Sequence, residues 1–153
     1  MDEITLPAAP WHEIIPGLWM GGHDFGDFYD PIPAIVDDEF DRVVSLFHRP
    51  GHGPHPAVAH TIARIRDGKL HDYDLDMIRD LAGSLAADVR DGRKVLIRCQ
   101  AGLNRSGLLT AFVLIRLGHS PTDAIRLIRA RRSPHALFNE HFVLYIAEEE
   151  FHG

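Results

Sequence analysis

Residues 94–107 read Lys-Val-Leu-Ile-Arg-Cys-Gln-Ala-Gly-Leu-Asn-Arg-Ser-Gly, and this stretch decides which fold class the sequence predicts. Its first part, Lys94 to Cys99, is an apolar run that predicts a buried strand ending at the cysteine. A five-residue loop follows, and we expect a helix over Ser106 to Leu117 that is apolar on nearly every side and ends at Gly118. A buried strand, a loop and a buried helix in this order indicate an α/β fold.

The loop between this strand and this helix is suited to binding an anion. Loop amides that point inward, together with the positive end of a helix, surround a phosphate well. The same field favours Cys99 as a thiolate, the form that acts as a nucleophile. Arg105, six positions after the cysteine, carries a planar fork that grips two phosphate oxygens at once. A lone cysteine near a strand end is more often an inert buried thiol, but Gly102, Arg105 and Ser106 favour the catalytic interpretation.

The segments around this motif predict alternating strands and helices in one domain spanning residues 1–153. Residues 1–12 are expected to be irregular, and no repeat or linker divides the chain. The apolar spacing predicts strands or strand pairs over residues 13–22, 42–47 and 59–65, and helices over residues 75–89, from Ser120 onward, and over residues 139–151. Such an order is typical of a mostly parallel sheet covered by helices.

Composition excludes several classes of protein. The 153-residue chain has 16 basic and 22 acidic residues and a net charge of −6, which argues against a nucleic-acid partner. It has a single cysteine, so an intramolecular disulfide framework and a cysteine-rich zinc site are excluded and a reducing compartment is indicated. No apolar run is long enough to span a membrane, and the acidic start lacks the pattern of a secretory signal. We therefore expect a cytoplasmic protein with no membrane partner.

The sequence CQAGLNRSG, residues 99–107, resembles the C-x5-R-[ST] signature loop of protein tyrosine phosphatases, and especially that of the dual-specificity branch. The segments GLWMGG (17–22), FDRVVSLF (40–47) and ALFN (136–139) resemble other parts of that branch. The resemblance implies an α/β fold with a central, mostly parallel sheet of four to five strands flanked by helices. It also implies a cysteine-dependent phosphomonoesterase that acts on a phosphorylated protein or a small phosphoester and needs no cofactor and no metal.

The resemblance also implies a role for each residue of the motif. Cys99 would be the nucleophile that forms a phosphocysteine intermediate, and the Arg105 side chain would stabilise the transition state. The Ser106 hydroxyl would assist the thiolate and the hydrolysis of the intermediate. The backbone amides that would bind the phosphate belong to Gln100, Ala101, Gly102, Leu103, Asn104 and Arg105.

A carboxylic acid from a separate loop would protonate the leaving oxygen, and Asp67 is our choice. It follows a predicted strand and precedes Gly68, which suits a mobile loop, although a plain Asp-Gly turn explains the same residues. The alternatives Asp72, Asp74 and Asp76 resemble acidic residues in the first turn of the following helix.

The chain departs from the family pattern at two places. The residue before the cysteine is usually a histidine that helps to hold the loop, whereas here it is Arg98. A neighbouring positive charge also favours a thiolate, so we expect altered tuning and not loss of activity. The Trp-Pro pair that precedes the acid in classical tyrosine phosphatases is absent, which removes that subgroup.

Two clusters of side chains could have a function, but each is explained as well by its place on the protein surface. His48, His52, His55 and His60 fit no standard zinc spacing, and the prolines and glycines between them suggest a solvent-exposed loop. Arg126, Arg129, Arg131 and Arg132 suit an acidic partner or a second phosphate, but a solvated helix end explains them better.

Two other functions compete with a phosphatase. One is a catalytically weak phosphate-binding module, which the substitution at Arg98 leaves open. The other is a rhodanese-like sulfurtransferase that carries a persulfide on Cys99, although Arg105 and Ser106 favour phosphate. Loop positions 100–104 contain no basic residue, which disfavours polyphosphorylated inositol lipids as substrates.

Overall fold

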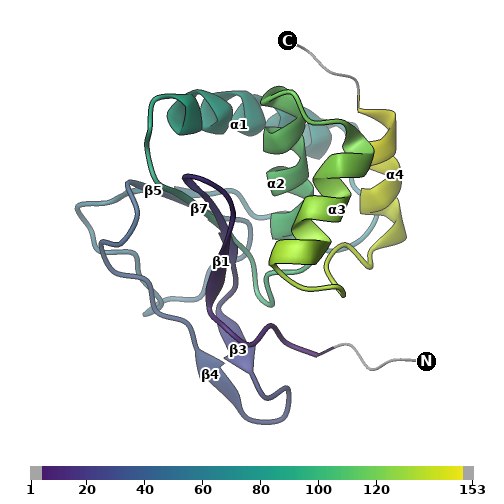
Figure 1. Cartoon of the computed structure of the whole chain (residues 1–153). Coiled ribbons are helices and arrows are strands. Elements are labelled where there is room, and N and C mark those ends of the chain that lie inside the picture. Colours follow the sequence, from purple (N-terminus) through teal and green to yellow (C-terminus); the bar gives the residue numbers. More distant parts are fainter. Residues whose placement is uncertain (1–4, 150–153) are drawn as a thin grey trace.

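The computed structural model describes residues 5–149, and it confirms the α/β class with a central sheet flanked by helices (Figure 1). The sheet has five strands in the order β1-β2-β7-β5-β6. Strand β1 is antiparallel to β2, and the other neighbouring strands are parallel. The carboxyl ends of the parallel strands therefore meet at one edge, with β7 in the middle. The bounds are β1 (Trp11–Ile15), β2 (Leu18–Gly21), β5 (Arg42–Ser45), β6 (Ala59–Ile62) and β7 (Val95–Arg98).

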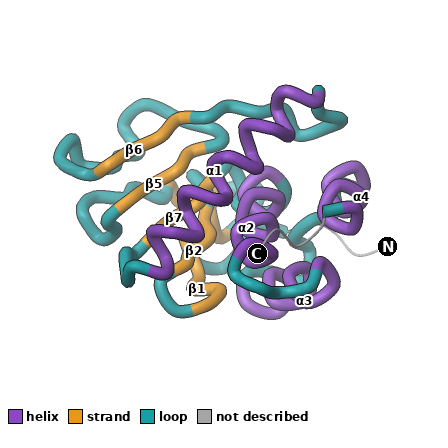
Figure 2. Tube along the Cα trace, turned by 90° about the horizontal axis from the view of Figure 1, so that it is seen from above, coloured by secondary structure: helices purple, strands orange, loops and turns teal. Residues whose placement is uncertain are grey.

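Within residues 5–149 the chain forms four helices, one before strand β7 and three after it, and they cover one face of the sheet (Figure 2). Helix α1 lies across the strands, and α2 packs against β2 and β7 in the centre of the fold. Every residue from Ser106 to Ile115 in α2 is buried, as its apolar sequence predicts. The bounds are α1 (Asp72–Arg90), α2 (Arg105–Arg116), α3 (Pro121–Arg131) and α4 (Glu140–Glu148).

Strand β7 contributes to a hydrophobic cluster on each face of the sheet. Ile97 belongs to the larger cluster, which the helices cover, and Leu96 belongs to a smaller cluster with Val36, Phe40 and Val43. Burial on both faces explains why the sequence of this strand is apolar at consecutive positions. The strand that carries the cysteine is thus the most firmly enclosed part of the sheet.

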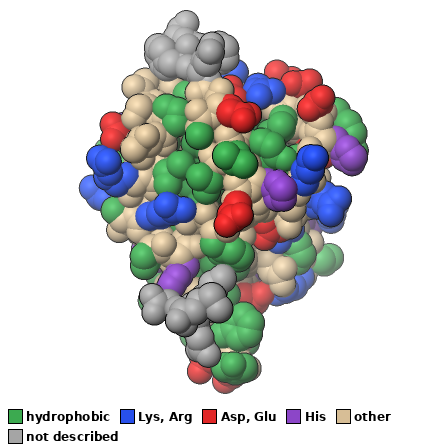
Figure 3. All heavy atoms as spheres, turned by 90° about the vertical axis from the view of Figure 1, so that its right-hand side faces the viewer, with side chains coloured by type: hydrophobic (Ala, Val, Ile, Leu, Met, Phe, Trp, Pro, Cys, Tyr) green, Lys and Arg blue, Asp and Glu red, His purple; other side chains and the backbone are tan. Residues whose placement is uncertain are grey.

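A small two-stranded sheet, β3 (Asp24–Gly26) with β4 (Pro31–Pro33), projects from the lower end of the molecule in Figure 1. The sequence did not predict it, because these strands are short and proline-rich. Hydrophobic side chains gather at this end in Figure 3, and Phe28 and Tyr29 are exposed there. Elsewhere on that face basic and acidic side chains are interspersed. Within the described residues, no helix is both long and apolar enough to cross a membrane.

The structure corrects several predicted boundaries. Strand β1 begins at Trp11 because Trp11 pairs with Gly21, so the expectation of an irregular segment through residue 12 is wrong at its end. Residues 1–4 lie outside the described part of the chain. Helix α4 ends at Glu148, whereas Phe151, its expected last residue, lies outside the described part as well. The cap at Ser120 is confirmed, since its hydroxyl accepts a hydrogen bond from the Asp123 amide at 3.1 Å.

Candidate active site

The cysteine stands where β7 reaches the carboxyl edge of the sheet. The Cys99 amide donates to the Gly21 carbonyl at 3.2 Å, which extends the pairing between β2 and β7 by one residue. The side chain is almost completely buried, with 2% of its surface exposed. Its sulfur lies 3.2 Å from the hydroxyl oxygen of Ser106, the second residue of α2. The predicted strand, loop and helix therefore bring the thiol and the hydroxyl together.

The backbone carbonyls from Cys99 to Leu103 each face a partner outside the loop. The Cys99 carbonyl contacts the His23 ring at 2.9 Å, and the Gln100 carbonyl accepts from the His23 amide at 2.7 Å. Arg132 donates to the Gly102 and Ala101 carbonyls at 3.0 and 3.3 Å. The Leu103 carbonyl accepts from the Leu137 amide at 3.1 Å. Because the C=O and N–H groups of a trans peptide point in opposite directions, the loop amides point to its inner side.

The inner side of the loop offers these amides to a ligand. Among the described residues, the backbone amides from Gln100 to Arg105 have no acceptor. Helix α2 begins at Arg105 with no side-chain cap from Asn104 and no acidic residue in its first turn. The positive end of the helix and the free amides thus form a concave donor surface, which is what binding of a phosphate requires.

Two glycines allow the loop to approach the sheet closely. Gly102 has a φ of 74°, and a Cβ atom there would collide with the Arg132 guanidinium and lie 2.6 Å from the Gly21 carbonyl. A Cβ atom on Gly22 would lie 2.8 Å from the Gln100 carbonyl oxygen. The path of the loop therefore depends on the absence of side chains at both positions.

Arg105 has a guanidinium group that is ready for a ligand. Its Nε atom is buried and has no hydrogen-bond partner, and no carboxylate of the described residues pairs with the group. The guanidinium carbon lies 5.3 Å from the centre of the Phe47 ring, which supports it from one side. A buried donor without an acceptor costs free energy, so an anion that supplies the acceptor is favoured here.

The interpretation of the basic stretch as a solvated helix end is wrong for Arg132. Arg132 is 4% exposed, and besides the two loop carbonyls it donates to the Ala9 carbonyl at 2.9 Å. Burial lowers the pKa of Arg132 to about 10, and the charge on Cys99 acts in the opposite direction, so the guanidinium remains charged at neutral pH. Arg129 donates to the carbonyls of Ala136 and Leu137. Sequence spacing could not reveal the loop carbonyls as partners of Arg132, because the loop lies about thirty positions earlier in the chain.

Arg98 makes contacts that the sequence did not predict. It is fully buried, and it donates to the Ser45 hydroxyl at 2.9 Å and to the carbonyls of His52 and Gly53 at 2.8 and 2.6 Å. Burial lowers the pKa of Arg98 to about 10. Its side chain therefore braces the loop at residues 48–55, and no contact joins it to the sulfur. Arg132 is a cation whose charge interacts with that of Cys99.

The histidine loop is not simply solvent-exposed, as the sequence suggested. His52 is 9% exposed and contacts the Ala34 carbonyl through Nδ1 at 3.0 Å. His60 contacts the Ser45 hydroxyl at 2.7 Å, and burial lowers its pKa to about 4. His55 is exposed. No group of three histidine, cysteine or acidic side chains in residues 5–149 is arranged to hold a metal ion.

Asp67 lies on the loop between β6 and α1 and reaches the nucleophile loop. Its two carboxylate oxygens accept hydrogen bonds from the side-chain amides of Asn104 at 3.0 Å and Asn139 at 2.7 Å. Asn104 belongs to the loop itself, and Asn139 caps α4. The alternatives Asp72 and Asp74 lie in the first turn of α1, as expected. Sequence reasoning missed Asn139, which connects the C-terminal helix to the site.

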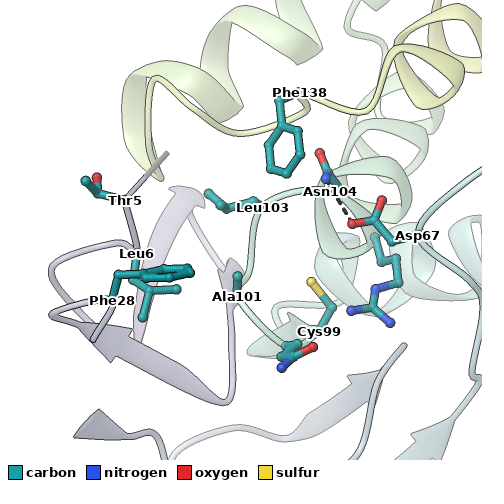
Figure 4. Close-up of a pocket in the computed structure, with 11 residues that line it drawn as sticks. Thr5, Leu6, Phe28, Asp67, Cys99, Ala101, Leu103, Asn104 and Phe138 are labelled. Carbon is teal, nitrogen blue, oxygen red and sulfur yellow. Dashed lines mark hydrogen bonds between the residues drawn. The ribbon is translucent and has the colours of Figure 1, made fainter. Parts of the chain in front are cut away.

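Cys99, Asp67 and Arg105 line one pocket of about 180 Å³ (Figure 4). The alternatives Asp72, Asp74 and Asp76 do not line it. Its walls are largely apolar, and they come from segments far apart in the sequence. These wall residues are Leu6, Phe28, Ala101, Leu103 and Phe138. Cys99 thus lies at the base of a cleft with aromatic side chains on two sides.

Comparisons with known proteins agree with this geometry. A family model described as the catalytic domain of dual specificity phosphatases matches residues 68–150. None of the curated proteins compared with the chain matches it. Human DUSP28 has a similar structure, with a TM-score of 0.72 and 20% identity over 95% of this chain and 97% of that one.

Two further solved structures resemble the chain. The human tyrosine phosphatase-like serine/threonine/tyrosine-interacting protein has a TM-score of 0.64 and 20% identity over 90% of this chain and 93% of that one. OH1 from the Orf virus, described as a tyrosine phosphatase, has a TM-score of 0.65 and 16% identity over 94% and 87%. At these identities the similarity shows a shared fold only, and membership of the family rests on the family model.

Proposed function

The chain belongs to the dual specificity phosphatase catalytic-domain family, and from that premise we propose that it hydrolyses phosphate monoesters with Cys99 as the nucleophile. One observation carries the proposal: the loop after Cys99 turns its carbonyls outward to partners and leaves its amides free around a buried thiol. A phosphate bound by the amides of residues 100–105 would present its phosphorus to the sulfur. Arg105 would bind two of the phosphate oxygens and stabilise the charge of the transition state.

The reaction would proceed in two displacements. In the first, the Cys99 thiolate forms a bond to phosphorus, the bond from phosphorus to the ester oxygen breaks, and Asp67 gives its proton to the departing oxygen. In the second, water attacks phosphorus while Asp67 takes its proton, the sulfur–phosphorus bond breaks, and inorganic phosphate leaves. The Ser106 hydroxyl, 3.2 Å from the sulfur, would donate to the thiolate and so assist its departure.

The position of Asp67 suits the role of the acid, but one of its hydrogen bonds has to open before it can act. Both oxygens accept amide hydrogen bonds from Asn104 and Asn139, which hold the carboxyl group beside the loop. The hydroxyl oxygen of a protonated carboxyl group is a poorer acceptor than a carboxylate oxygen, so we expect one contact to open before the acid acts. Asn139 is half-buried and not part of the loop, so its contact is the one we expect to open.

The pocket walls favour an aromatic phosphoester such as phosphotyrosine. Phe28 and Phe138 stand on two sides of the cleft, and Leu6 and Leu103 complete its apolar surface. An aromatic ring buries more apolar area against such walls than the short side chain of phosphoserine does. We therefore expect a larger kcat/KM for a phosphotyrosine peptide than for the matched phosphoserine peptide.

The second candidate is a phosphate-binding module with little turnover. The observation that favours it is the same pair of contacts on Asp67, because two donors stabilise the carboxylate and oppose its protonation. Such a module would bind a phosphotyrosine peptide and release phosphate no faster than the Cys99→Ser variant does.

The test is hydrolysis of an activated aryl phosphate and of a phosphotyrosine peptide, with and without a chelator. We expect chelator-resistant turnover that Cys99→Ser abolishes while peptide binding persists. Asp67→Ala should depress peptide hydrolysis much more than hydrolysis of the activated ester, because only the peptide has a poor leaving group. Asp72→Ala is the matched control and should do neither. Turnover that survives Cys99→Ser would contradict the covalent mechanism.

A further inference from the structure

His23 contacts the first two peptide units of the nucleophile loop from outside the motif. It follows β2 and lies 76 positions before Cys99 in the chain. Its side chain is completely buried. The ring Nδ1 lies 2.9 Å from the Cys99 carbonyl oxygen, and the backbone amide donates to the Gln100 carbonyl at 2.7 Å. One residue therefore binds two consecutive carbonyls at the point where the strand becomes the loop.

These two hydrogen bonds fix the direction of two amides. The C=O of Cys99 and the N–H of Gln100 belong to one planar peptide and point in opposite directions, and the same holds for the next peptide. Holding both carbonyls at His23 therefore directs the amides of Gln100 and Ala101 away from it, toward the inner side of the loop. Neither amide has an acceptor within the described residues. The orientation of both amides is thus determined by His23, which binds the two carbonyls.

The surroundings of the ring determine its protonation state and its orientation. Nε2 lies 3.3 Å from the Arg49 backbone amide and accepts from it, so the hydrogen of the neutral ring is on Nδ1, facing Cys99. The pKa of His23 is lowered to about 4, chiefly by burial; the hydrogen bond to the Cys99 carbonyl acts in the opposite direction, and the charges of Arg98, His52 and His48 add to the effect of burial. Phe47 and His52 each pack against the ring at 5.2 Å between centroids. The donor on Nδ1 is therefore held in place over the ordinary pH range.

We propose that His23 is a positioning residue that holds the nucleophile loop and so preserves the reactive thiolate of Cys99. The family resemblance assigns this task to a histidine directly before the cysteine, but Arg98 occupies that position and turns toward Ser45 and Gly53. A histidine that follows strand β2 supplies the hydrogen bond instead. This role rests on the proposed function, but the state of the Cys99 thiol can be measured whether or not the protein turns over a substrate.

The experiment uses variants that separate the two ring nitrogens. The amide nitrogen of asparagine can take the place of Nδ1, whereas the amide group of glutamine reaches the place of Nε2. Iodoacetamide alkylation reports on Cys99 alone because the chain has one cysteine. We expect the midpoint of the alkylation pH profile to rise by about one pH unit in His23→Gln. In His23→Asn, whose side chain restores the donor, it should stay near the wild-type value.

His60→Gln is the matched control, since His60 belongs to the same group of histidines and contacts the Ser45 hydroxyl and the His48 ring, whereas no contact within the described residues joins it to His23 or to the loop after Cys99. Its alkylation profile should match that of the wild type. Equal shifts in His23→Gln and His60→Gln, or no rescue in His23→Asn, would overturn the proposal. If the variants do not fold, the ring ¹⁵N shifts of the wild-type protein decide: hydrogen on Nδ1 supports the proposal, and hydrogen on Nε2 refutes it. A shift of the profile in a chain without phosphatase activity would support the positioning role and count only against the proposed function.

Discussion

Replacing Arg132 by methionine removes the buried cation that holds the far side of the nucleophile loop. The substitution leaves the Ala101 and Gly102 carbonyls without their donor. A hydrogen bond to a charged group contributes about 1.5–3 kcal/mol, and relief of the desolvation of the guanidinium offsets part of the loss. We expect the free energy of unfolding to fall by roughly 3 kcal/mol, which for a domain of this size lowers Tm by about 6–12 °C.

The kcat/KM of this variant should fall as well, by a comparable free energy. Once the two carbonyls are free to rotate, the amides of the same peptides lose their fixed direction, and loss of one such preorganised donor costs about a hundredfold or more in rate. The assay is kcat/KM with an activated aryl phosphate below the new Tm, together with a thermal unfolding curve. Arg131→Met is the matched control, because Arg131 is the preceding residue on α3 and is exposed.

Two results would refute this reasoning. An unchanged Tm would mean that the contacts of Arg132 with the loop carry no net free energy. A lowered Tm with an unchanged kcat/KM would mean that Arg132 anchors the segment at Ala9 and that the amides keep their direction without it.

Further predictions follow from the same contacts. Arg105→Lys should lower kcat by about a hundredfold or more, because an ammonium group does not reproduce the two parallel hydrogen bonds of the guanidinium, and near-normal turnover would show that only the charge matters. Peroxide should inactivate the enzyme by oxidising Cys99, and inorganic phosphate should slow the loss; equal rates with and without phosphate would contradict the placement of the thiol at the anion site. Stability should fall as the pH drops from about 6.5 to about 4, because the pKa of His23 is lowered to about 4 in the folded chain and the unfolded chain takes up the proton first. The loss attributable to His23 is up to about 3 kcal/mol; urea unfolding at both ends of this range should show a flatter pH dependence in His23→Asn, and identical slopes would contradict the assignment.

The fold class and the placement of Cys99 and Arg105 could be predicted because they depend on neighbours in the sequence, whereas the role of Cys99 as the nucleophile stays a prediction. An apolar strand, a cysteine at its end and a buried helix that begins six residues later place Cys99, Arg105 and Ser106 at the two ends of one short loop. The cap at Ser120 is local for the same reason. Asp67 was placed at the pocket from its position before the helix, and its role as the acid stays a prediction.

The residues that hold the loop could not be predicted, because each reaches it from a distant segment. Arg132 looks like any cation at a helix end until α3 packs beside the loop, and a histidine after β2 carries no local signal at His23. The contacts of Arg98 could not be predicted either, because the direction of a side chain at a strand end depends on which segment packs beside it. Here that segment is the loop that contains His52 and Gly53.

The most direct test of the proposed mechanism is to trap the covalent intermediate. The protein is mixed with an excess of an activated aryl phosphate, quenched in acid within the first turnovers, digested and examined by mass spectrometry. The expected result is one phosphoryl group on the peptide that contains Cys99, with none in Cys99→Ser and more in a variant of Asp67, because the second displacement needs its base. Turnover at the wild-type rate with no phosphoryl group on Cys99 at any quench time would contradict the proposal that the sulfur attacks phosphorus.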